Sequence, residues 1–528
     1  MAKLTEEADI SRKAEYKPLS FSTTMRSPQR IAAFLNCVLP FEGEKLNNEI
    51  IHKIVKKLIF QKLYKTTFEV KDTRLKGIFK GEEEFSNYDL EYIIANSPQN
   101  HKESGFDKGW PSRFDTWFKL PMEFGFIFYE IGQNIVISVV GHMLIDAFNE
   151  IPQNGAKIQN VFLNALIKYQ SNNPFRKNAN ANVPLLLLLN VIKELKNRIP
   201  ESTGIFRKEL ALIICWPNAD YNTLVKKICE IRNEYGFSYS DEIVYDICLG
   251  ILGVDYTKKK RFKINQITGE AIDEFIRKMR ITGIISLRGN GRFLDINTYE
   301  IDKVNYVLEK YSVYPILATK KDYFEYVGAI DNKIIAIKQK VISNLEILKM
   351  TSLNYWAKLF KKEEIYKELI ALNKRNECKN EILRVIDRPT RMEFLASIAL
   401  KQTFTDLVVI PNYSIDDEGL PIFTAAGGLA DIECFDKDCN PLFEVTLMTA
   451  RTQATNEMPA ITRHLIDAIK KYPDKKVFAV LVAPTIHIDT KYMAEFSKHQ
   501  YNVDILTLTI LECVEKFQIL SSVGKFIV

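Results

Sequence analysis

The sequence lacks the cysteine patterns and the long apolar runs that define several protein classes. Its eight cysteines form no C-x-x-C pair and no Cys/His group at zinc spacing, so neither a disulfide framework nor a zinc site is expected. The longest apolar run, Leu185 to Leu189 with its flanks, is far below the roughly 20 residues of a membrane span. The first residues lack the apolar core of a signal peptide. These absences predict an intracellular, cytoplasmic protein with no membrane partner.

Several catalytic motifs are also missing. There is no G-x-G-x-x-G or Walker lysine, which argues against nucleotide-driven chemistry. There is no G-x-S-x-G, which argues against hydrolysis through a serine ester. The net charge of +6, from 72 Lys+Arg against 66 Asp+Glu, does not require a polyanionic partner. With 528 residues and 46% hydrophobic residues, the chain is long and apolar enough for two to four packed domains.

The first 310 residues show twice the order helix, short hairpin, helix, which is typical of winged-helix units. We expect two such subdomains, at about 1–150 and 151–310, although ordinary α+β cores would give the same pattern. A strongly apolar helix over 183–197 and an apolar run over 210–216 lie between them. The expected segments are a helix ending at 116–122, strands at 126–130 and 135–138 and a helix from Gly141, then a helix at 270–280 and strands at 284–287 and 293–296.

Basic residues around the second hairpin favour DNA as the partner. The cluster contains Arg277, Lys278, Arg280, Arg288 and Arg292, and a Lys/Arg run at 258–263 precedes it. Charge runs are usually solvated surface, so this cluster indicates phosphate contact and no particular base sequence. The candidate DNA-binding residues are Arg26, Lys259, Arg261, Arg288 and Arg292.

A helical linker is predicted between the recognition region and a third region, whose pattern alternates between helices and strands. Residues 311–388 are rich in Lys, Glu, Ile and Leu, with heptad-like spacing of Ile334, Ile337, Val341, Leu345 and Leu348. From 389 to 528 the pattern predicts a smaller α/β domain with a mixed central sheet. The expected elements are helices at 391–401 and about 458–471, and strands at 406–410, 430–435, 442–447, 477–483 and 503–508.

Two acids on neighbouring strands of this domain carry the chemistry. Asp431 and Glu444 lie thirteen residues apart across a predicted hairpin, among apolar neighbours. A carboxylate in such surroundings costs free energy unless it is paired, hydrogen-bonded or bound to a cation. Taken singly, each acid is more often an edge or salt-bridge residue, but two across one hairpin indicate a hard cation such as Mg²⁺. Glu433 shares the facing of Asp431 and is either a further acid of the site or a solvated neighbour.

Asp431, the hairpin and the string Glu444-Val445-Thr446 resemble the PD-(D/E)XK nuclease core, with Thr446 where the signature lysine normally stands. The longer pattern resembles the AlwI family of type IIS restriction endonucleases and related nicking enzymes. It consists of residues 425–433, Glu444-Val445-Thr446, Glu457 and Ile461-Thr462-Arg463-His464, with shorter upstream matches at 26–28, 124–128, 282–283 and 288–290.

The resemblance implies an N-terminal recognition region, a helical linker and a C-terminal cleavage domain. It implies Asp431, Glu444 and Val445 as the metal set, and Glu393, Glu457 and His464 as further catalytic residues. Each of the last three has an ordinary alternative: Thr390-x-x-Glu393 fits a capping box, Glu457 fits the positive end of a helix, and His464 fits a carboxylate partner. Threonine at 446 cannot supply the lysine's positive charge, so the metals, Arg463 or His464 would have to do so.

The sequence therefore predicts a Mg²⁺-dependent site-specific deoxyribonuclease of type IIS, or a strand-specific nickase or large subunit, that cuts double-stranded DNA a short distance outside an asymmetric site. Mn²⁺ is expected to replace Mg²⁺, and Ca²⁺ to support binding without cleavage. Cutting both strands would require a transient homodimer or a second nuclease subunit. The alternatives are a winged-helix regulatory protein with an inactive nuclease-like domain, and a structure-reading repair nuclease, which would need a smaller recognition region.

Overall fold

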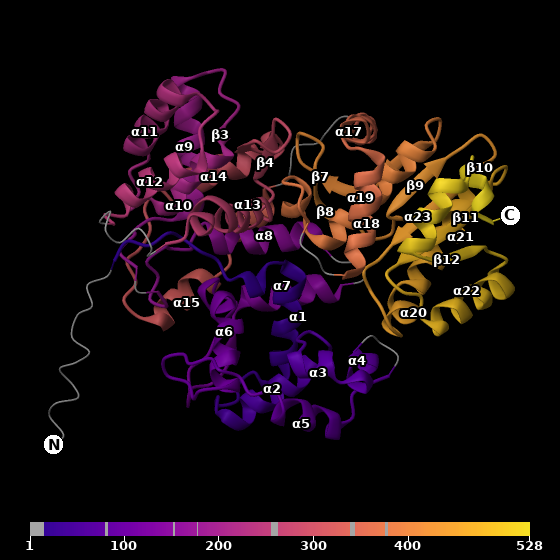
Figure 1. Cartoon of the computed structure of the whole chain (residues 1–528), viewed down its shortest axis with the longest axis horizontal. Coiled ribbons are helices and arrows are strands. Elements are labelled where there is room, and N and C mark those ends of the chain that lie inside the picture. The colour runs from indigo at the N-terminus through magenta and orange to yellow at the C-terminus, as the bar shows by residue number, and fades with distance from the viewer. Residues whose placement is uncertain are drawn as a thin grey trace.

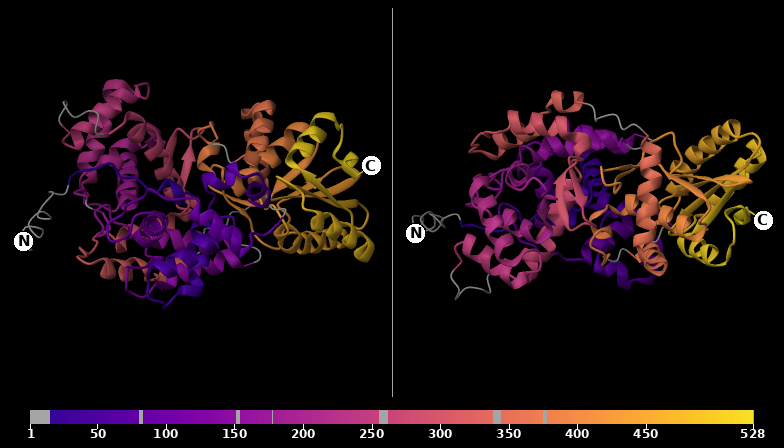
Figure 2. Two further views of the ribbon diagram at one scale, coloured as in Figure 1. Left: turned by 60° about the horizontal axis from the view of Figure 1, so that its bottom comes forward. Right: turned by 90° about the horizontal axis from the view of Figure 1, so that it is seen from above.

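The computed structural model describes residues 15–79, 83–150, 154–176, 178–254, 262–337, 344–374 and 378–527. It is a mostly helical α+β protein with a mixed five-stranded sheet near the C-terminus. In all three views of Figures 1 and 2 the chain from about residue 345 onward lies toward one end of the long axis, and the helices before it fill the rest.

The N-terminal half is built from short amphipathic helices around a continuous apolar core. Local signals set their ends: Ser27 accepts a hydrogen bond from the backbone N–H of Arg30, and Pro28 occupies the first turn of α1, where a missing N–H costs nothing. The helices up to the linker are α1 (Pro28–Val38), α2 (Asn48–Phe60), α3 (Thr67–Lys71), α4 (Thr73–Phe79), α5 (Asn87–Ala95), α6 (Trp110–Glu123), α7 (Val139–Asn149), α8 (Gly155–Leu166), α9 (Pro184–Arg198), α10 (Leu210–Cys215), α11 (Tyr221–Tyr235), α12 (Asp241–Ile251), α13 (Ala271–Arg280) and α14 (Ile301–Lys310).

Both predicted helix-hairpin units are present. In the first, α6 leads into the antiparallel pair β1 (Ile127–Phe128) and β2 (Val136–Ile137), and α7 follows. In the second, α13 leads into β4 (Ile285–Arg288) and β5 (Phe293–Ile296). A third strand, β3 (Ile205–Phe206), pairs with β5 and was not expected, because two residues carry no readable alternation.

Residues 311–388 are largely helical where the structure describes them, but the heptad interpretation is wrong. The segment is divided into α15 (Lys320–Gly328), α16 (Asn332–Ala336), α17 (Leu345–Leu359) and α18 (Lys362–Ala371). Ile334 lies in α16 and Leu345 in α17, where it is exposed, so the two do not share a helix or a buried stripe. Val341 lies outside the described residues. The apolar residues of these helices pack on the two flanking regions instead of on a coiled-coil partner.

The C-terminal sheet has the order β12-β11-β10-β9-β6. β10 pairs in parallel with β11, and β11 with β12, whereas β9 is antiparallel to both β10 and β6. The strands are β6 (Val408–Pro411), β9 (Ile432–Phe435), β10 (Cys439–Val445), β11 (Lys476–Ala483) and β12 (Ile505–Thr509). Each expected strand is present with ends shifted by a few residues. A small hairpin of β7 (Tyr413–Ile415) and β8 (Pro421–Ala425) was not expected.

Helices cover both faces of this sheet. Phe443 and Val480 point into the large core shared with α19 and α23, whereas Leu442 and Leu481 join a smaller cluster under α21. All seven residues of the central strand β10 are buried, which explains why its polar Glu444 needs a special environment. The helices are α19 (Arg388–Thr403), α20 (Thr452–Asn456), α21 (Met458–Lys471), α22 (Ile488–Tyr501) and α23 (Ile510–Ile519).

In the described parts of the chain, no helix is long and apolar enough to cross a membrane. All eight cysteines are free thiols, and seven of them are buried.

Candidate active site

The hairpin of β9 and β10 brings the two predicted acids into contact. Its register pairs Leu442 with Glu433 and Phe443 with Ile432, so Glu444 falls opposite Asp431, the residue before β9. Two hydrogen bonds from backbone N–H groups hold the acids beside each other. The N–H of Val445 donates to Oδ2 of Asp431 at 2.8 Å, and the N–H of Asp431 donates to Oε2 of Glu444 at 3.3 Å. These bonds fix both carboxylates at one end of the hairpin.

These acids hold their protons unusually strongly. Burial raises the pKa of Glu444 to about 8. Burial, together with the negative charge of Glu444, holds the pKa of Asp431 well above its usual range. Crowded carboxylates of this kind can all ionise only when a cation joins them. The electrostatics of the hairpin therefore favour a bound positive ion.

Glu393 enters the same cluster from α19. It is 3% exposed, and its Oε2 accepts a hydrogen bond from the backbone N–H of Ala425 at 2.9 Å. Burial and the charge of Asp431 raise its pKa well above the ordinary value. The capping-box alternative is wrong, because α19 begins at Arg388 and Glu393 lies in its second turn.

Glu457 and Thr446 form a pair beside the hairpin. Glu457 is the residue before α21, as expected, and burial raises its pKa while a hydrogen bond with the Thr446 side chain lowers it. The Oγ1 of Thr446 also accepts the backbone N–H of Met448 at 3.1 Å. The residue in the usual lysine position thus orients an acid instead of supplying a charge.

His464 lies on the next turns of α21 and faces Glu444. Its Nδ1 lies 2.9 Å from Oε1 of Glu444. His464 is therefore the partner of a carboxylate, which is the alternative to a catalytic role that the sequence left open. Burial lowers the pKa of His464, whereas the charge of Asp431 raises it. Nε2 is left as the ring nitrogen that can meet a substrate or a water.

The donor set fits a magnesium ion. Mg²⁺ usually takes one or two protein carboxylates and completes its shell with water and phosphate oxygens. Asp431 and Glu444 provide the carboxylates, and Val445 can contribute only its backbone oxygen. No three His, Cys, Asp or Glu side chains of the described residues converge into a ready metal cage, so water and substrate would have to supply the remaining ligands.

Comparison with known proteins identifies the family. The model of the AlwI restriction endonuclease family matches residues 122–355 and 330–515, which together span most of the chain. The chain belongs to the AlwI restriction endonuclease family. It is accordingly a DNA-binding deoxyribonuclease, a restriction endonuclease of type IIS-like character.

Two solved restriction endonucleases show more distant similarity to this AlwI family member. The small subunit of the heterodimeric restriction endonuclease R.BspD6I is 21% identical, covers 29% of this chain and 76% of its own, and gives a TM-score of 0.24. FokI bound to DNA is 12% identical, covers 98% of each chain, and also gives a TM-score of 0.24. No curated protein matches the chain.

The candidate DNA contacts of this AlwI family member differ in their availability. Arg292 is exposed at the tip of the β4–β5 hairpin, with its guanidinium 5.8 Å from the ring centroids of both Phe206 and Phe293. Arg26 is paired with Glu274 at 2.9 Å, and Arg288 bonds Asp295 at 2.6 Å and Asp417 at 2.7 Å. Lys259 and Arg261 lie outside the described residues.

Other members of the basic cluster serve the interior of the protein. Lys278 is buried and donates to the backbone oxygens of Met25 and Arg26, and Arg280 is buried against Asp416. Arg277 binds the backbone oxygen of Arg384. These bonds join α13 to the N-terminus, the linker and the β7–β8 hairpin, so the cluster includes structural cations that the sequence could not separate from surface ones.

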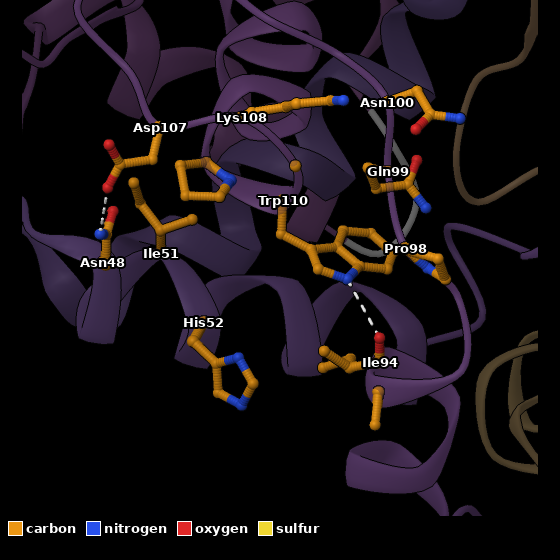
Figure 3. A pocket seen from close by; sticks show the side chains of 13 residues that line it. Asn48, Ile51, His52, Ile94, Pro98, Gln99, Asn100, Asp107, Lys108 and Trp110 are labelled. Atoms are coloured by element: carbon orange, nitrogen blue, oxygen red, sulfur yellow. Dashed lines mark hydrogen bonds between the residues drawn. The ribbon is translucent and has the colours of Figure 1, made fainter.

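A cavity of about 670 Å³ lies far from these acids in sequence, between α2 and the start of α6. Figure 3 shows Asn48 bonded to Asp107 on one side and Trp110 bonded to the backbone oxygen of Ile94 on the other. None of the predicted catalytic or DNA-binding residues lines it. By its chemistry, the acid cluster of Asp431, Glu444, Glu393 and Glu457 is the stronger candidate for the active site.

Lys349 of α17 was not singled out from the sequence, although it is buried and burial lowers its pKa to about 8. The signal was its position at the start of a stripe with Leu353, Trp356 and Phe360, spaced by four, three and four residues.

Proposed function

We propose that this restriction endonuclease hydrolyses DNA phosphodiester bonds at the acid cluster, a short distance outside an asymmetric recognition sequence. The observation that carries the proposal is the pair Asp431 and Glu444, which backbone hydrogen bonds hold side by side. Burial raises the pKa of both carboxyls, and the pair fits a divalent cation. Asp431, Glu444 and the Val445 oxygen would hold Mg²⁺. When bound, that ion would stabilise the negative charge that develops on the phosphate oxygens and lower the pKa of water.

The chain's own side chains divide the remaining work in this proposal. His464 Nδ1 and Glu444 fix each other's orientation, which leaves Nε2 free to hold or move a proton. Thr446 keeps Glu457 in place, and the backbone of Ala425 does the same for Glu393. These residues would position water and phosphate oxygens around the scissile bond.

We propose residues 1–310 as the recognition region, 311–388 as the linker and 389–528 as the cleavage domain. Each helix-hairpin unit would place a helix in the major groove. One such active site cuts one strand, so cutting both strands requires a transient homodimer or a second nuclease subunit. We place the enzyme in the cytoplasm, where its eight thiols stay reduced.

The direct test is incubation with supercoiled plasmid and Mg²⁺, followed by sequencing of the product ends. Cuts at a fixed offset from one asymmetric sequence are expected. Linear product would show that both strands are cut, and open-circular product that only one is cut. Mn²⁺ should also support cutting, and Ca²⁺ should support binding alone. Intact binding without cutting would favour a regulatory DNA-binding protein instead.

Metal binding should become more stabilising as the pH rises. The raised pKa of Glu444, about 8, means that the folded protein keeps a proton that the unfolded chain has lost. The unfolding free energy of the metal-free protein therefore falls as the pH rises from about 4.5 to about 8. Since a cation competes with that proton, Ca²⁺ should raise the melting temperature more at pH 8.5 than at pH 6. An equal shift at both pH values, or none, would contradict this site; Glu444→Gln is the control.

Replacing Arg292 should weaken DNA binding without unfolding the protein. The exposed guanidinium has no ion-pair partner among the described residues, so a phosphate could bind it without displacing a carboxylate. Arg292→Ala should lower the salt slope of the binding constant by about one unit. Arg292→Lys, which keeps the charge, should retain the slope. Unchanged affinity and slope in the alanine variant would show that Arg292 is a solvated surface residue that does not contact DNA.

A further inference from the structure

The β7–β8 hairpin connects two parts of the molecule that are distant in sequence. Its loop, residues 416–420, is bonded to the β4–β5 hairpin of the proposed recognition region. Its open end, formed by Asn412 before β7 and Ala425 at the end of β8, is bonded to the acid cluster. Figure 1 places the hairpin between β4 and β9. A displacement of the loop can therefore reach the acids through a short path.

Asp417 is the main anchor of the loop. Its Oδ1 accepts a hydrogen bond from Oγ of Ser286 at 2.5 Å, and its Oδ2 accepts one from Nη2 of Arg288 at 2.7 Å. Oδ2 also accepts bonds from the backbone N–H and the side-chain hydroxyl of Thr298, at 2.9 and 2.8 Å. Four donors thus meet one carboxylate, and hydrogen bonds to a charged acceptor are among the strong ones.

Buried contacts add to this anchorage. Asp416, the residue before Asp417, is fully buried, and its Oδ2 lies 3.2 Å from Nη2 of Arg280 on α13. Phe423 of β8 packs on Gly155, the first residue of α8, where a Cβ atom would stand 2.6 Å from Cδ1 of the ring. Only glycine permits that approach without a shift of the ring. The hairpin and the proposed recognition region therefore fit closely along their contact.

The open end of the hairpin holds two of the four acids. The N–H of Ala425 donates to Oε2 of Glu393 at 2.9 Å. The N–H of Asn412 donates to the backbone oxygen of Asp431 at 2.9 Å, and Nδ2 of Asn412 donates to that of Ala430 at 2.7 Å. The hairpin thus fixes one acid by its carboxylate and the other by the backbone that carries it.

The hairpin is too short to hold this shape alone. β7 has three residues and β8 five, the register between them is irregular on both sides of Ser414, and they form a sheet of their own. An isolated two-stranded hairpin is marginally stable in water. Tyr413 of this hairpin is buried edge-on against Phe394, the residue after Glu393, with ring centroids 6.0 Å apart. Loosening the loop should therefore loosen the support of both acids.

We propose that the β7–β8 hairpin is a positioning element of the cleavage site, whose anchorage on the recognition region holds Glu393 and Asp431 in the arrangement that binds the metal ion. Asp417 and Asn412 are its positioning residues, one at each end. The inference rests on the proposed role of the acid cluster in cleavage. It gives the residues before 311 a second task, because their contacts with the loop contribute to the geometry of an active site whose acids all come from residues after 388.

The first test compares Asp417→Ala and Ser286→Ala with the control Asp406→Ala, which removes an exposed acid of the same domain. Single-turnover cleavage with Mg²⁺ by Asp417→Ala should fall about 10- to 100-fold, the usual effect of losing a partner that supports metal ligands. Ser286→Ala removes one buried oxygen and one of the four bonds, and should lower the rate by a smaller factor. Asp406→Ala should cleave like the native protein. DNA affinity in Ca²⁺ should change by less than a few-fold in all three.

Two results would overturn the proposal. Native-like cleavage by folded Asp417→Ala would show that the loop contact does not matter to the acids. Faster cleavage would show that this contact restrains the site instead of supporting it. If Asp417→Ala does not fold, the same two results decide the question in Ser286→Ala.

The second test measures the metal site without DNA. The rise in melting temperature that Ca²⁺ produces at pH 8.5 should be smaller in Asp417→Ala and in Asn412→Ala than in the native protein, because misplaced acids bind the ion less well. The Mg²⁺ concentration for half-maximal cleavage should be higher in both variants. A hairpin that only stabilises the fold would lower the melting temperature of the metal-free protein and leave both metal measurements unchanged.

The third test combines the two ends of the hairpin in a double-variant cycle. If Asp417 and Asn412 act through one element, the double variant should lose much less activity than the product of the two single losses. Losses that simply multiply would refute the connection. Asp431→Asn separates this inference from the proposed function: cutting by that variant refutes the site, whereas an inactive Asp431→Asn beside a fully active Asp417→Ala refutes only the role of the hairpin.

Discussion

Asp431→Asn should reduce the rate of cleavage by about a thousandfold or more, because loss of a metal ligand removes several kcal/mol of transition-state stabilisation. The asparagine keeps the size of the side chain and an oxygen that can accept the N–H of Val445, so the hairpin should stay intact. Cleavage is measured under single-turnover conditions with Mg²⁺, and DNA affinity is measured in Ca²⁺. The affinity should stay within a few-fold of the native value.

The matched control is Asp438→Asn, which neutralises an exposed aspartate in the turn of the same hairpin. It changes the net charge by the same amount and should leave cleavage unchanged. Cutting by Asp431→Asn at near-native rate would remove Asp431 from the mechanism. Loss of cutting in both variants would instead indicate that the charge of the whole hairpin matters.

Arg280→Met should destabilise the contact between α13 and the β7–β8 hairpin by about 3 kcal/mol, because removing one partner of a buried ion pair leaves the other uncompensated. Nη2 of Arg280 lies 3.2 Å from Oδ2 of Asp416, and both side chains are buried. The same nitrogen also donates to the backbone oxygen of Pro421. Urea unfolding followed by fluorescence and circular dichroism would measure the loss.

The expected loss depends on pH and on Asp416. Burial raises the pKa of Asp416 to about 6 even though Arg280 lowers it. Without the arginine, the carboxyl can stay protonated at pH 5, so the destabilisation should be smaller at pH 5 than at pH 8. Adding Asp416→Asn to Arg280→Met should recover part of the loss. A loss that is equal at both pH values and is not recovered would show that packing, not the ion pair, stabilises this contact.

The sequence predicted the acid hairpin because its signals are local. Asp431 directly precedes β9 and Glu444 lies on the adjacent strand β10, and a short turn joins the two strands, so the alternation of the strands alone is enough to pair the acids. His464 was expected on the following helix, and the structure places it against Glu444. The catalytic roles of all these residues stay predictions until the variants are measured.

Contacts between distant segments were harder to predict. Glu393 looked like part of a capping box, since Thr390 has the right spacing for the N-cap. The helix, however, begins at Arg388, two residues before Thr390, so Thr390 lies inside it. The contact of Glu393 with Ala425 depends on the β7–β8 hairpin, whose short strands give little periodic signal. Lys349 looked like one of many linker lysines, because its burial depends on the docking of α17 against α19.

The same limit explains the basic cluster and the linker. Arg280 and Arg292 have the same residue type and lie twelve positions apart, yet one is buried and the other exposed. Only the tertiary fold separates them. The heptad spacing of the linker failed for a similar reason: α16 ends before Ile337, whose backbone is extended, and α17 begins only after Asn344, so the spaced apolar residues do not lie on one helix.

The bonding of Arg288 sets a condition on any contact it makes with DNA. A guanidinium has five N–H donors, and Arg288 already uses its three nitrogens on Asp295, Asp417, Glu418 and the backbone oxygen of Ile296. A two-pronged contact with a phosphate or a guanine is therefore excluded while these bonds persist. Two of the acceptors, Asp417 and Glu418, belong to the loop between β7 and β8. A two-pronged contact of Arg288 with DNA and its present hold on that loop are therefore mutually exclusive states of one side chain.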